Sequence, residues 1–257
     1  MASDRIERRS WRGALTAGLL IALVPVALAQ DRANASPVEA CLDANRNLSL
    51  GVRLARTAAR LNSAATLRIV AVGSSSTTGL WVLNAASTYP EVMRRELARL
   101  WPNVEFEVIN SGRIGDTVIG TLSRLHSDVL SYDPDLVVWQ LGTNDLVWGG
   151  RLDGVKDKLV EGVRALKSSG ADVVLMDLQY APRVLASVDY PIIQAIIADA
   201  AREQHIGLFS RFDLMQRSLK AGMASNALVS WDGLHNSADG YACIGKALAR
   251  AIHDAIH

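Results

Sequence analysis

The sequence predicts an α/β protein, a three-layer α/β/α sandwich built on a flavodoxin-like, five-stranded parallel sheet. Five short apolar runs, each about the length of a buried strand, alternate with longer segments whose apolar residues have helical spacing. No linker rich in Gly, Pro or Ser divides this alternation, and no internal repeat is present, so we expect one domain. Five strands fit a doubly wound sheet better than an eight-stranded barrel.

Each predicted strand is a short apolar run that ends near turn-forming residues. The first covers residues 67–72, reads Leu-Arg-Ile-Val-Ala-Val and is followed by Gly73. Such runs are typical of strands that are buried on both faces of a parallel sheet. The other four predicted strands cover residues 104–109, 136–141, 173–176 and 206–209.

The segments between the strands predict helices, because their apolar residues recur every three or four positions. Pro90 stands near the start of the first helix, and Pro102 stops it. Residues 38–62 contain no long apolar run and predict an irregular or helical N-terminal arm. The predicted helices cover residues 90–100, 118–130, 155–166, 192–201 and 238–256.

The composition excludes several classes of protein. Of 257 residues, 49% are hydrophobic and 21% are charged, which are ordinary globular proportions. The formal net charge is only +1, so the chain lacks the excess of basic residues that is typical of nucleic-acid-binding proteins. Two cysteines are too few for a four-thiolate zinc site, and the five histidines are scattered. We therefore expect neither a metal nor an organic cofactor, and no nucleic-acid partner.

Residues 1–29 have the pattern of a signal peptide. Four arginines precede an apolar run over residues 14–29, which is short for a bilayer span of ~20 residues. The run ends in Ala27-Leu28-Ala29, small residues of the kind that a signal peptidase reads. The alternative is an uncleaved membrane anchor. We predict a signal peptide, an arm over residues 30–62 and a domain over residues 63–257, exported to the periplasm or beyond with no stable membrane insertion after cleavage.

Export would place Cys41 and Cys243 in an oxidising compartment, where two cysteines form a plausible pair. A disulfide between them would close a loop of about 200 residues. The alternative is two buried free thiols, since cysteine also packs as a small hydrophobic residue. The sequence favours the disulfide.

Polar segments follow successive strands, at the edge of the sheet where doubly wound proteins bind their ligands. Taken singly, each segment is also typical of a turn or a helix cap. Their common position at the strand ends is the informative observation. They are residues 73–79 (Gly-Ser-Ser-Ser-Thr-Thr-Gly), 110–117 (Asn-Ser-Gly-Arg-Ile-Gly-Asp-Thr), 142–145 (Gly-Thr-Asn-Asp) and, just before the last helix, 231–235 (Trp-Asp-Gly-Leu-His).

These segments contain the groups that acyl transfer needs. A serine hydroxyl becomes a nucleophile when an imidazole takes its proton, and histidine has a pKa near neutrality. Asp232 and His235 lie three residues apart, so the carboxylate is placed to orient the imidazole. The N–H groups of Ser75 and Gly115, with the side-chain amide of Asn144, are candidates for an oxyanion hole.

The four segments resemble blocks I, II, III and V of the SGNH (GDSL-type) hydrolases, and in particular an exported bacterial branch of that family. The resemblance extends over residues 67–252. It implies that Ser75 is the nucleophile, that Asp232 and His235 are the acid and the base, and that Gly115 and Asn144 belong to the oxyanion hole. It also implies an esterase or related acyl hydrolase on a three-layer sandwich, without metal or organic cofactor.

The sequence departs from the family pattern at two positions. Ser74 stands where the family has an aspartate before the nucleophile, so three serines follow one another and the assignment of Ser75 depends on register. Asn236 stands where a proline often follows the block V histidine. The pattern Gly-x-Ser-x-Gly is absent because Thr77 occupies its last position, which disfavours an α/β-hydrolase nucleophile elbow.

Several neighbouring residues have supporting interpretations. Asp145 is expected to brace its loop, and Asp116 and Thr117 to cap the helix that follows. The other four histidines are expected to have no catalytic role. Four aromatic residues are candidates to flank the site, where they would stack on a sugar or cover an acyl chain; they are Trp81, Trp148, Tyr180 and Trp231.

The leading hypothesis is a secreted serine ester hydrolase that acts through an acyl-enzyme on Ser75, with a small ester or an acylated glycan as substrate. A second hypothesis keeps these residues and makes the protein an acetyl esterase or O-acyltransferase on cell-envelope polysaccharide. The third is a non-catalytic module that binds a glycan or a phosphate-bearing ligand in the serine-rich loop.

Overall fold

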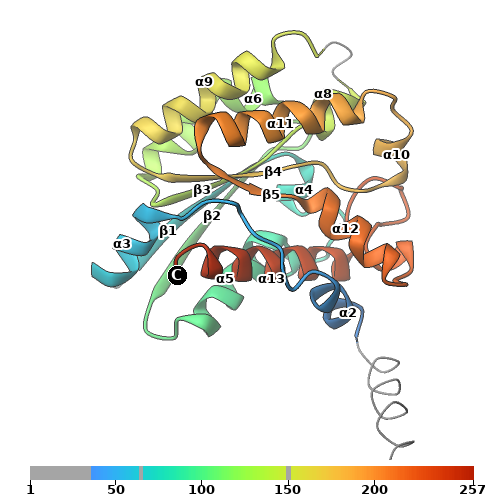
Figure 1. Cartoon of the computed structure of the whole chain (residues 1–257), viewed down its shortest axis with the longest axis horizontal. Helices are drawn as coiled ribbons and strands as arrows, with labels where there is room; N and C mark the ends of the chain where they lie inside the picture. Colours follow the sequence, from blue (N-terminus) through green and yellow to red (C-terminus); the bar gives the residue numbers. More distant parts are fainter. Residues whose placement is uncertain (1–35, 64–65, 149–151) are drawn as a thin grey trace, which may run out of the picture. The chain divides into compact units, whose positions relative to one another are not determined.

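Five parallel strands form the centre of the structure, a computed structural model that describes residues 36–63, 66–148 and 152–257 (Figure 1). Their order in the sheet is β2-β1-β3-β4-β5, with helices on both faces. This is the flavodoxin-like order of a doubly wound sheet. The predicted fold class is confirmed.

All five predicted strands are present. They are β1 Thr66–Gly73, β2 Glu105–Gly112, β3 Leu136–Gln140, β4 Asp172–Met176 and β5 Gly207–Phe209. Every residue of the central strand β3 is buried, as expected for an apolar run inside a parallel sheet. In the register of the sheet, Gly73 pairs with Gly112 and Val72 pairs with Trp139, so the ends of β1, β2 and β3 lie at one edge.

Two helical layers cover the sheet. In Figure 1, α5 (Tyr89–Leu100) and α13 (Ala238–Asp254) lie on one side of the strands. On the other side lie α6 (Val118–Ser123), α9 (Val155–Ser168) and α11 (Tyr190–Gln204). The remaining helices are α2 Pro37–Ala44, α3 Ala55–Ser63, α4 Ser75–Thr78, α7 Leu125–Asp128, α8 Thr143–Val147, α10 Pro182–Leu185 and α12 Arg211–Lys220, with 3-10 turns η1 Ala85–Ser87, η2 Leu130–Tyr132 and η3 Ser225–Ala227.

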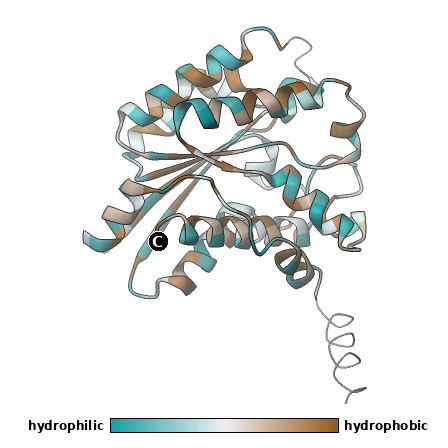
Figure 2. Ribbon diagram, viewed as in Figure 1, coloured by the Kyte–Doolittle hydropathy of each residue, from teal (hydrophilic) through white to brown (hydrophobic). Residues whose placement is uncertain are grey.

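Burial of apolar side chains between these layers holds them together. The strands are mostly hydrophobic in Figure 2, whereas the helices carry both hydrophilic and hydrophobic residues. Helices α5 and α13 approach closely at Gly245, where a Cβ atom would lie 2.7 Å from Cβ of Val92 and 2.8 Å from the Tyr89 carbonyl oxygen. Only glycine fits at this crossing without displacing α5.

One predicted helix is interrupted. Residues 118–130 form α6, α7 and the start of η2 rather than one continuous helix. The first break falls at Arg124, whose backbone leaves the helical region and whose buried guanidinium donates to Asp116 and to the Gly73 carbonyl. These bonds satisfy a cation that burial would otherwise destabilise, and they offset the lost helical turn.

In its described part the predicted arm is both helical and irregular: α2 and α3 are joined by a non-helical segment over residues 45–54. It packs into the core through buried Cys41, Leu42 and Leu54. A disulfide joins Cys41 of α2 to Cys243 of α13, with a Cα–Cα distance of 6.2 Å. The predicted disulfide is confirmed. The predicted signal peptide lies outside the described residues, and the domain boundaries after residues 29 and 62 remain predictions. Within the described ranges, no helix is both long and apolar enough to cross a membrane.

Removing the disulfide is expected to destabilise the fold. The double variant Cys41→Ala/Cys243→Ala should lose about 2–4 kcal/mol of unfolding free energy, because the open chain gains conformational entropy when it unfolds. Urea denaturation of the two proteins measures this difference. Added reductant should weaken the wild type and leave the variant unchanged; coincident unfolding curves for variant and wild type would contradict the prediction.

Candidate active site

The carboxyl end of β1 leads directly into a contact between residues that are far apart in the sequence. Ser74 is the N-cap of the short helix α4, and Ser75 is its first residue. The Oγ atom of Ser75 lies 2.8 Å from Nε2 of His235, at a sequence separation of 160. Both side chains are largely buried. Of the three consecutive serines, Ser75 is therefore the one whose hydroxyl reaches the imidazole.

The other ring nitrogen of His235 faces Asp232, as the sequence predicts. Nδ1 lies 2.5 Å from Oδ2 of Asp232, and Oδ1 accepts the backbone N–H groups of Leu234 and His235, each at 3.0 Å. Burial acts to raise the pKa of Asp232, but the hydrogen bonds from His235 and from these amides outweigh it and lower the pKa to about 2. Because the Asp232 carboxylate is ionised, it accepts a hydrogen bond, so Nδ1 of His235 carries the proton. The lone pair of Nε2 then faces Ser75.

Gly115 lies in a tight turn after β2. The Asp116 N–H donates to the Arg113 carbonyl oxygen at 3.1 Å, and Gly115 has φ +82°. This is the third position of a type II turn, where a positive φ is required and glycine is favoured. The turn delivers the chain into α6, whose N-cap Thr117 accepts from the Gly120 N–H as predicted.

Asn144 lies against this turn. Its Nδ2 atom donates to the Asp116 carbonyl oxygen at 2.8 Å. The neighbouring Asp145 accepts the Val118 N–H at 3.1 Å, so it braces the loop as expected. The carboxylate of Asp116 does not cap α6 as predicted; it pairs with Arg124 at 2.6 Å, because the buried guanidinium is the stronger donor. The structure thus brings Asn144 and the Gly115 turn together.

Two buried glutamines that the sequence analysis did not select hold these loops. Gln140, the last residue of β3, accepts through Oε1 from the Ser74 N–H and the Ser74 hydroxyl, both at 2.9 Å, and from the Thr77 hydroxyl at 3.2 Å. The loop that carries Ser75 is therefore fixed to the adjacent strand. A polar residue closing an otherwise apolar strand is the sequence signal that points to this role.

Gln179 connects two other parts of the site. Its Oε1 accepts from the Thr143 hydroxyl and from Arg211, both at 2.7 Å, and its Nε2 donates to the Leu234 carbonyl oxygen at 3.0 Å. Arg211 is fully buried; desolvation lowers its pKa to about 10, so it is still a cation at neutral pH. Through Gln179 the loop of Asn144 is joined to the turn of His235.

The four predicted aromatic residues lie in three different environments. The Nε1–H of Trp81 donates to Oδ2 of Asp232 at 2.9 Å, and the Trp81 ring lies 5.2 Å from the Trp231 ring. Trp148 is exposed, and the Cζ atom of Arg183 lies over its ring, 5.4 Å from the ring centroid. Tyr180 instead packs edge-on against Phe212. Trp81 and Trp231 thus flank Asp232, whereas Tyr180 belongs to the packing of α12.

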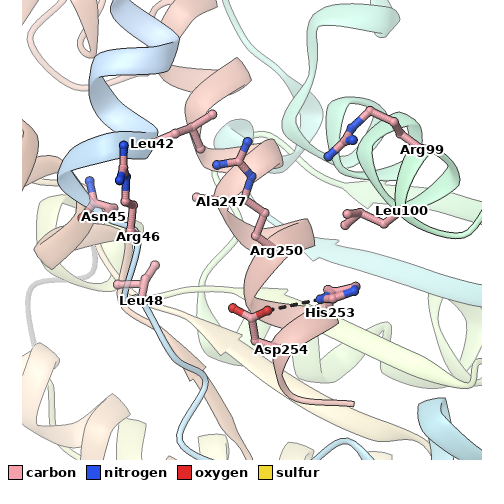
Figure 3. A pocket seen from close by; sticks show the side chains of 10 residues that line it. All are labelled: Leu42, Asn45, Arg46, Leu48, Arg99, Leu100, Ala247, Arg250, His253 and Asp254. Carbon is pink, nitrogen blue, oxygen red and sulfur yellow. Dashed lines mark hydrogen bonds and ion pairs between the residues drawn. The ribbon is translucent and has the colours of Figure 1, made fainter. Parts of the chain in front are cut away.

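A separate pocket of about 300 Å³ lies away from Ser75, at the opposite end of α13 (Figure 3). Helix α13 begins at Ala238, just after His235. Arg250 lies roughly 18 Å farther along the helix axis, at 1.5 Å per residue. Arg99 and Arg250 both reach Glu96, so their charges are partnered. The pocket is lined by Leu42, Asn45, Arg46, Leu48, Arg99, Leu100, Ala247, Arg250, His253 and Asp254.

A family model described as non-GDSL lipase-like matches residues 40–257. The chain belongs to the non-GDSL lipase-like family. An arylesterase of Vibrio mimicus is 30% identical over 120 residues, which are 47% of this chain and 58% of that protein. Esterase TesA of Pseudomonas aeruginosa is 29% identical over 119 residues, 46% of this chain and 58% of that protein. The matched part thus spans less than two thirds of each relative. These similarities confirm the predicted resemblance to SGNH (GDSL-type) esterases.

Solved structures with the same fold include two esterases that are described as acting on acetylated polysaccharides. An acetyl xylan esterase of Geobacillus stearothermophilus superposes with a TM-score of 0.63 at 20% identity, covering 72% of this chain and 94% of that one. A two-domain esterase active on acetylated mannans gives a TM-score of 0.71 at 20% identity, covering 82% of this chain and 56% of that one. At this identity the likeness concerns the fold alone.

The bonds of Gln179 are expected to contribute measurably to stability. Gln179→Leu should lower the free energy of unfolding by about 1–3 kcal/mol, because the Thr143 hydroxyl and the Leu234 carbonyl lose a buried partner. Chemical denaturation measures the change. Gln194→Leu, a similar substitution at a partly exposed position of α11, serves as control. Equal denaturation midpoints for the two variants would show that Gln179 has no such role.

Proposed function

We propose that this protein is a secreted serine hydrolase that cleaves carboxylic esters through an acyl-enzyme on Ser75. The observation that carries the proposal is the 2.8 Å contact between Ser75 Oγ and His235 Nε2, with Nδ1 of the same ring on Asp232. Nucleophile, base and orienting carboxylate then stand in the order that acyl transfer requires. Membership of a lipase-like family and the likeness to an arylesterase and to TesA support the same reaction.

In the first half of the reaction, His235 Nε2 takes the hydroxyl proton as Ser75 Oγ bonds to the ester carbonyl carbon. The oxyanion that forms would accept from the N–H groups of Ser75 and Gly115 and from Asn144 Nδ2. Ser75 lies in the first turn of α4, where backbone N–H groups have no acceptor within the helix. Collapse of the intermediate breaks the bond to the alcohol, which leaves with the proton from His235.

In the second half, His235 takes a proton from water as the water oxygen attacks the acyl carbon. Collapse of this second intermediate breaks the bond to Ser75 Oγ, which recovers its proton from His235, and the carboxylic acid is released. Asp232 remains ionised throughout, because its pKa is about 2. Its negative charge stabilises the imidazolium that forms in each half.

An acylated glycan is the substrate class that we favour among esters. Trp81 and Trp231, 50% and 81% exposed, lie beside Asp232 and offer ring faces of the kind on which a sugar stacks. Proteins with this fold include esterases of acetylated xylan and mannan. The alternative of an O-acyltransferase on cell-envelope polysaccharide uses the same residues; transfer of acetyl to an added sugar in preference to water would favour it.

The Cys41–Cys243 disulfide supports a location outside the cytoplasm, since disulfides persist in oxidising compartments. The arginine-flanked apolar run of residues 1–29 would direct that export as a cleaved signal peptide. We therefore assign the protein to the periplasm or the medium. A purely binding module fits less well, because it leaves the Ser75–His235–Asp232 contacts without a use.

Replacing Ser75 tests the nucleophile. Ser75→Ala should reduce hydrolysis of p-nitrophenyl acetate at least about 1,000-fold, because no other group takes over bond formation. A fluorophosphonate probe should add one covalent label to the wild type and none to the variant, as measured by intact-protein mass. Ser76→Ala, a change in the adjacent serine, should keep both activity and labelling. Substantial activity in Ser75→Ala would mean that the nucleophile lies elsewhere.

Replacing Asn144 tests the oxyanion hole. Asn144→Ala should lower kcat about 100- to 1,000-fold and leave KM nearly unchanged, because the amide is needed most when negative charge develops on the carbonyl oxygen. Steady-state kinetics with p-nitrophenyl acetate separates the two constants. Asn84→Ala, at the N-cap of η1, is the control. An unchanged kcat, or a rise in KM alone, would remove Asn144 from this role.

A further inference from the structure

Trp81 contacts the carboxylate that orients the proposed base. Its Nε1–H donates at 2.9 Å to Oδ2 of Asp232, the same oxygen that lies 2.5 Å from Nδ1 of His235. The two residues are 151 positions apart. An indole N–H only donates, so it cannot take the proton that the imidazole carries.

The backbone at Trp81 is held in an unfavourable conformation. Its φ is +73°, a left-handed value that costs a bulky residue of order 1 kcal/mol or more. Half of the side chain is exposed, so burial of the ring does not account for this conformation. In this strained conformation, the indole N–H of Trp81 reaches Asp232.

The segment around Trp81 is tied to the site on both sides. It follows Gly79, the C-cap of α4, and so continues directly from the helix that begins with Ser75. The carbonyl oxygen of Leu80 accepts from the buried Tyr241 hydroxyl of α13 at 3.2 Å. One stretch of chain therefore carries Ser75 at one end and a donor to Asp232 at the other.

With Trp81 in place, each oxygen of the Asp232 carboxylate has two donors. The backbone N–H groups of Leu234 and His235 bind Oδ1, and Trp81 and His235 bind Oδ2. Rotation of the carboxylate away from the imidazole would break several charge-assisted bonds at once. Without the indole N–H, Oδ2 keeps only its bond to the ring that moves a proton.

We infer that Trp81 is a positioning residue for the proposed reaction, one that holds Asp232 Oδ2 against Nδ1 of His235 through its indole N–H. The inference rests on the proposed function. Trp81 also links the segment that carries Ser75 to the turn that carries Asp232. A displacement of α4 would therefore move the indole N–H that binds Asp232. Trp81 acts on the base through Asp232, and its role is separate from any stacking of substrate on its ring.

Trp81→Phe tests this role, since it keeps an aromatic ring and removes the N–H. We expect kcat with p-nitrophenyl acetate to fall about tenfold and KM to change less than about threefold, because the loss falls on the transition state. In proton NMR, the Nδ1–H resonance of His235 should shift and exchange faster with water than in the wild type. Trp101→Phe, at a tryptophan that packs against Phe106 and His253, should alter neither the kinetics nor this resonance.

Trp81→Gly separates the hydrogen bond from the strain. Glycine adopts a φ of +73° without penalty, so this variant should keep its thermal stability and still lose kcat and the wild-type resonance. Recovery of wild-type kcat in Trp81→Gly, an unchanged kcat in Trp81→Phe, or an effect on KM alone would overturn the inference.

The NMR measurement keeps the inference independent of the assay. If the wild type hydrolyses no ester, the proposed function fails, while the Nδ1–H resonance still reports the contact between Asp232 and His235. An identical resonance and exchange rate in wild type and Trp81→Phe would then contradict the positioning role. A shifted, faster-exchanging resonance would support it.

Discussion

Polar side chains that are buried at the carboxyl ends of the strands need hydrogen-bond partners inside the protein, and here those partners are the loops of the candidate site. Gln140 binds the loop of Ser75, and Gln179 joins the loop of Asn144 to the turn of His235. Arg211, fully buried, supplies a charged donor behind Gln179. The requirement to satisfy these groups orders segments that would otherwise be surface turns.

This constraint explains how a site assembled from distant segments is ready before a substrate arrives. Short polar loops are usually the more mobile parts of an α/β protein. In this chain they are bonded to β3 and to one another, so the geometry of Ser75 and His235 does not depend on their own contact alone. Preorganisation of this kind would lower the reorganisation cost of the proposed reaction.

Much of the architecture could be predicted from the sequence. The apolar runs predict the strands. Because parallel strands end at the same edge of the sheet, the polar segments that follow them predict where the candidate site lies. The contact of Ser75 with His235 was predictable from the family resemblance, although Ser74 departs from the pattern. In the structure the Ser74 hydroxyl donates to Gln140, whereas the adjacent Ser75 hydroxyl contacts the imidazole.

The contacts that escaped prediction are those between side chains far apart in the sequence. Gln179 reaches Leu234 across 55 positions, and Trp81 reaches Asp232 across 151. Neither pair belongs to a motif or a resemblance that the sequence analysis used. The interruption at Arg124 also depends on contacts outside the helix, since the guanidinium donates to the Gly73 carbonyl, 51 positions away, and to Asp116. Helix α12 was missed for a simpler reason: its N-cap Ser210 and its apolar residues follow directly on the short strand β5.

The bridge between α2 and α13 has a topological consequence. It closes a covalent ring between residues at a sequence separation of 202, and this ring contains every described strand and all of the candidate site. A protease that cuts one surface loop inside this ring opens the ring without releasing a fragment. The nicked molecule stays a single covalent species until it meets a reductant, so one cut inside the ring is tolerated without loss of chain.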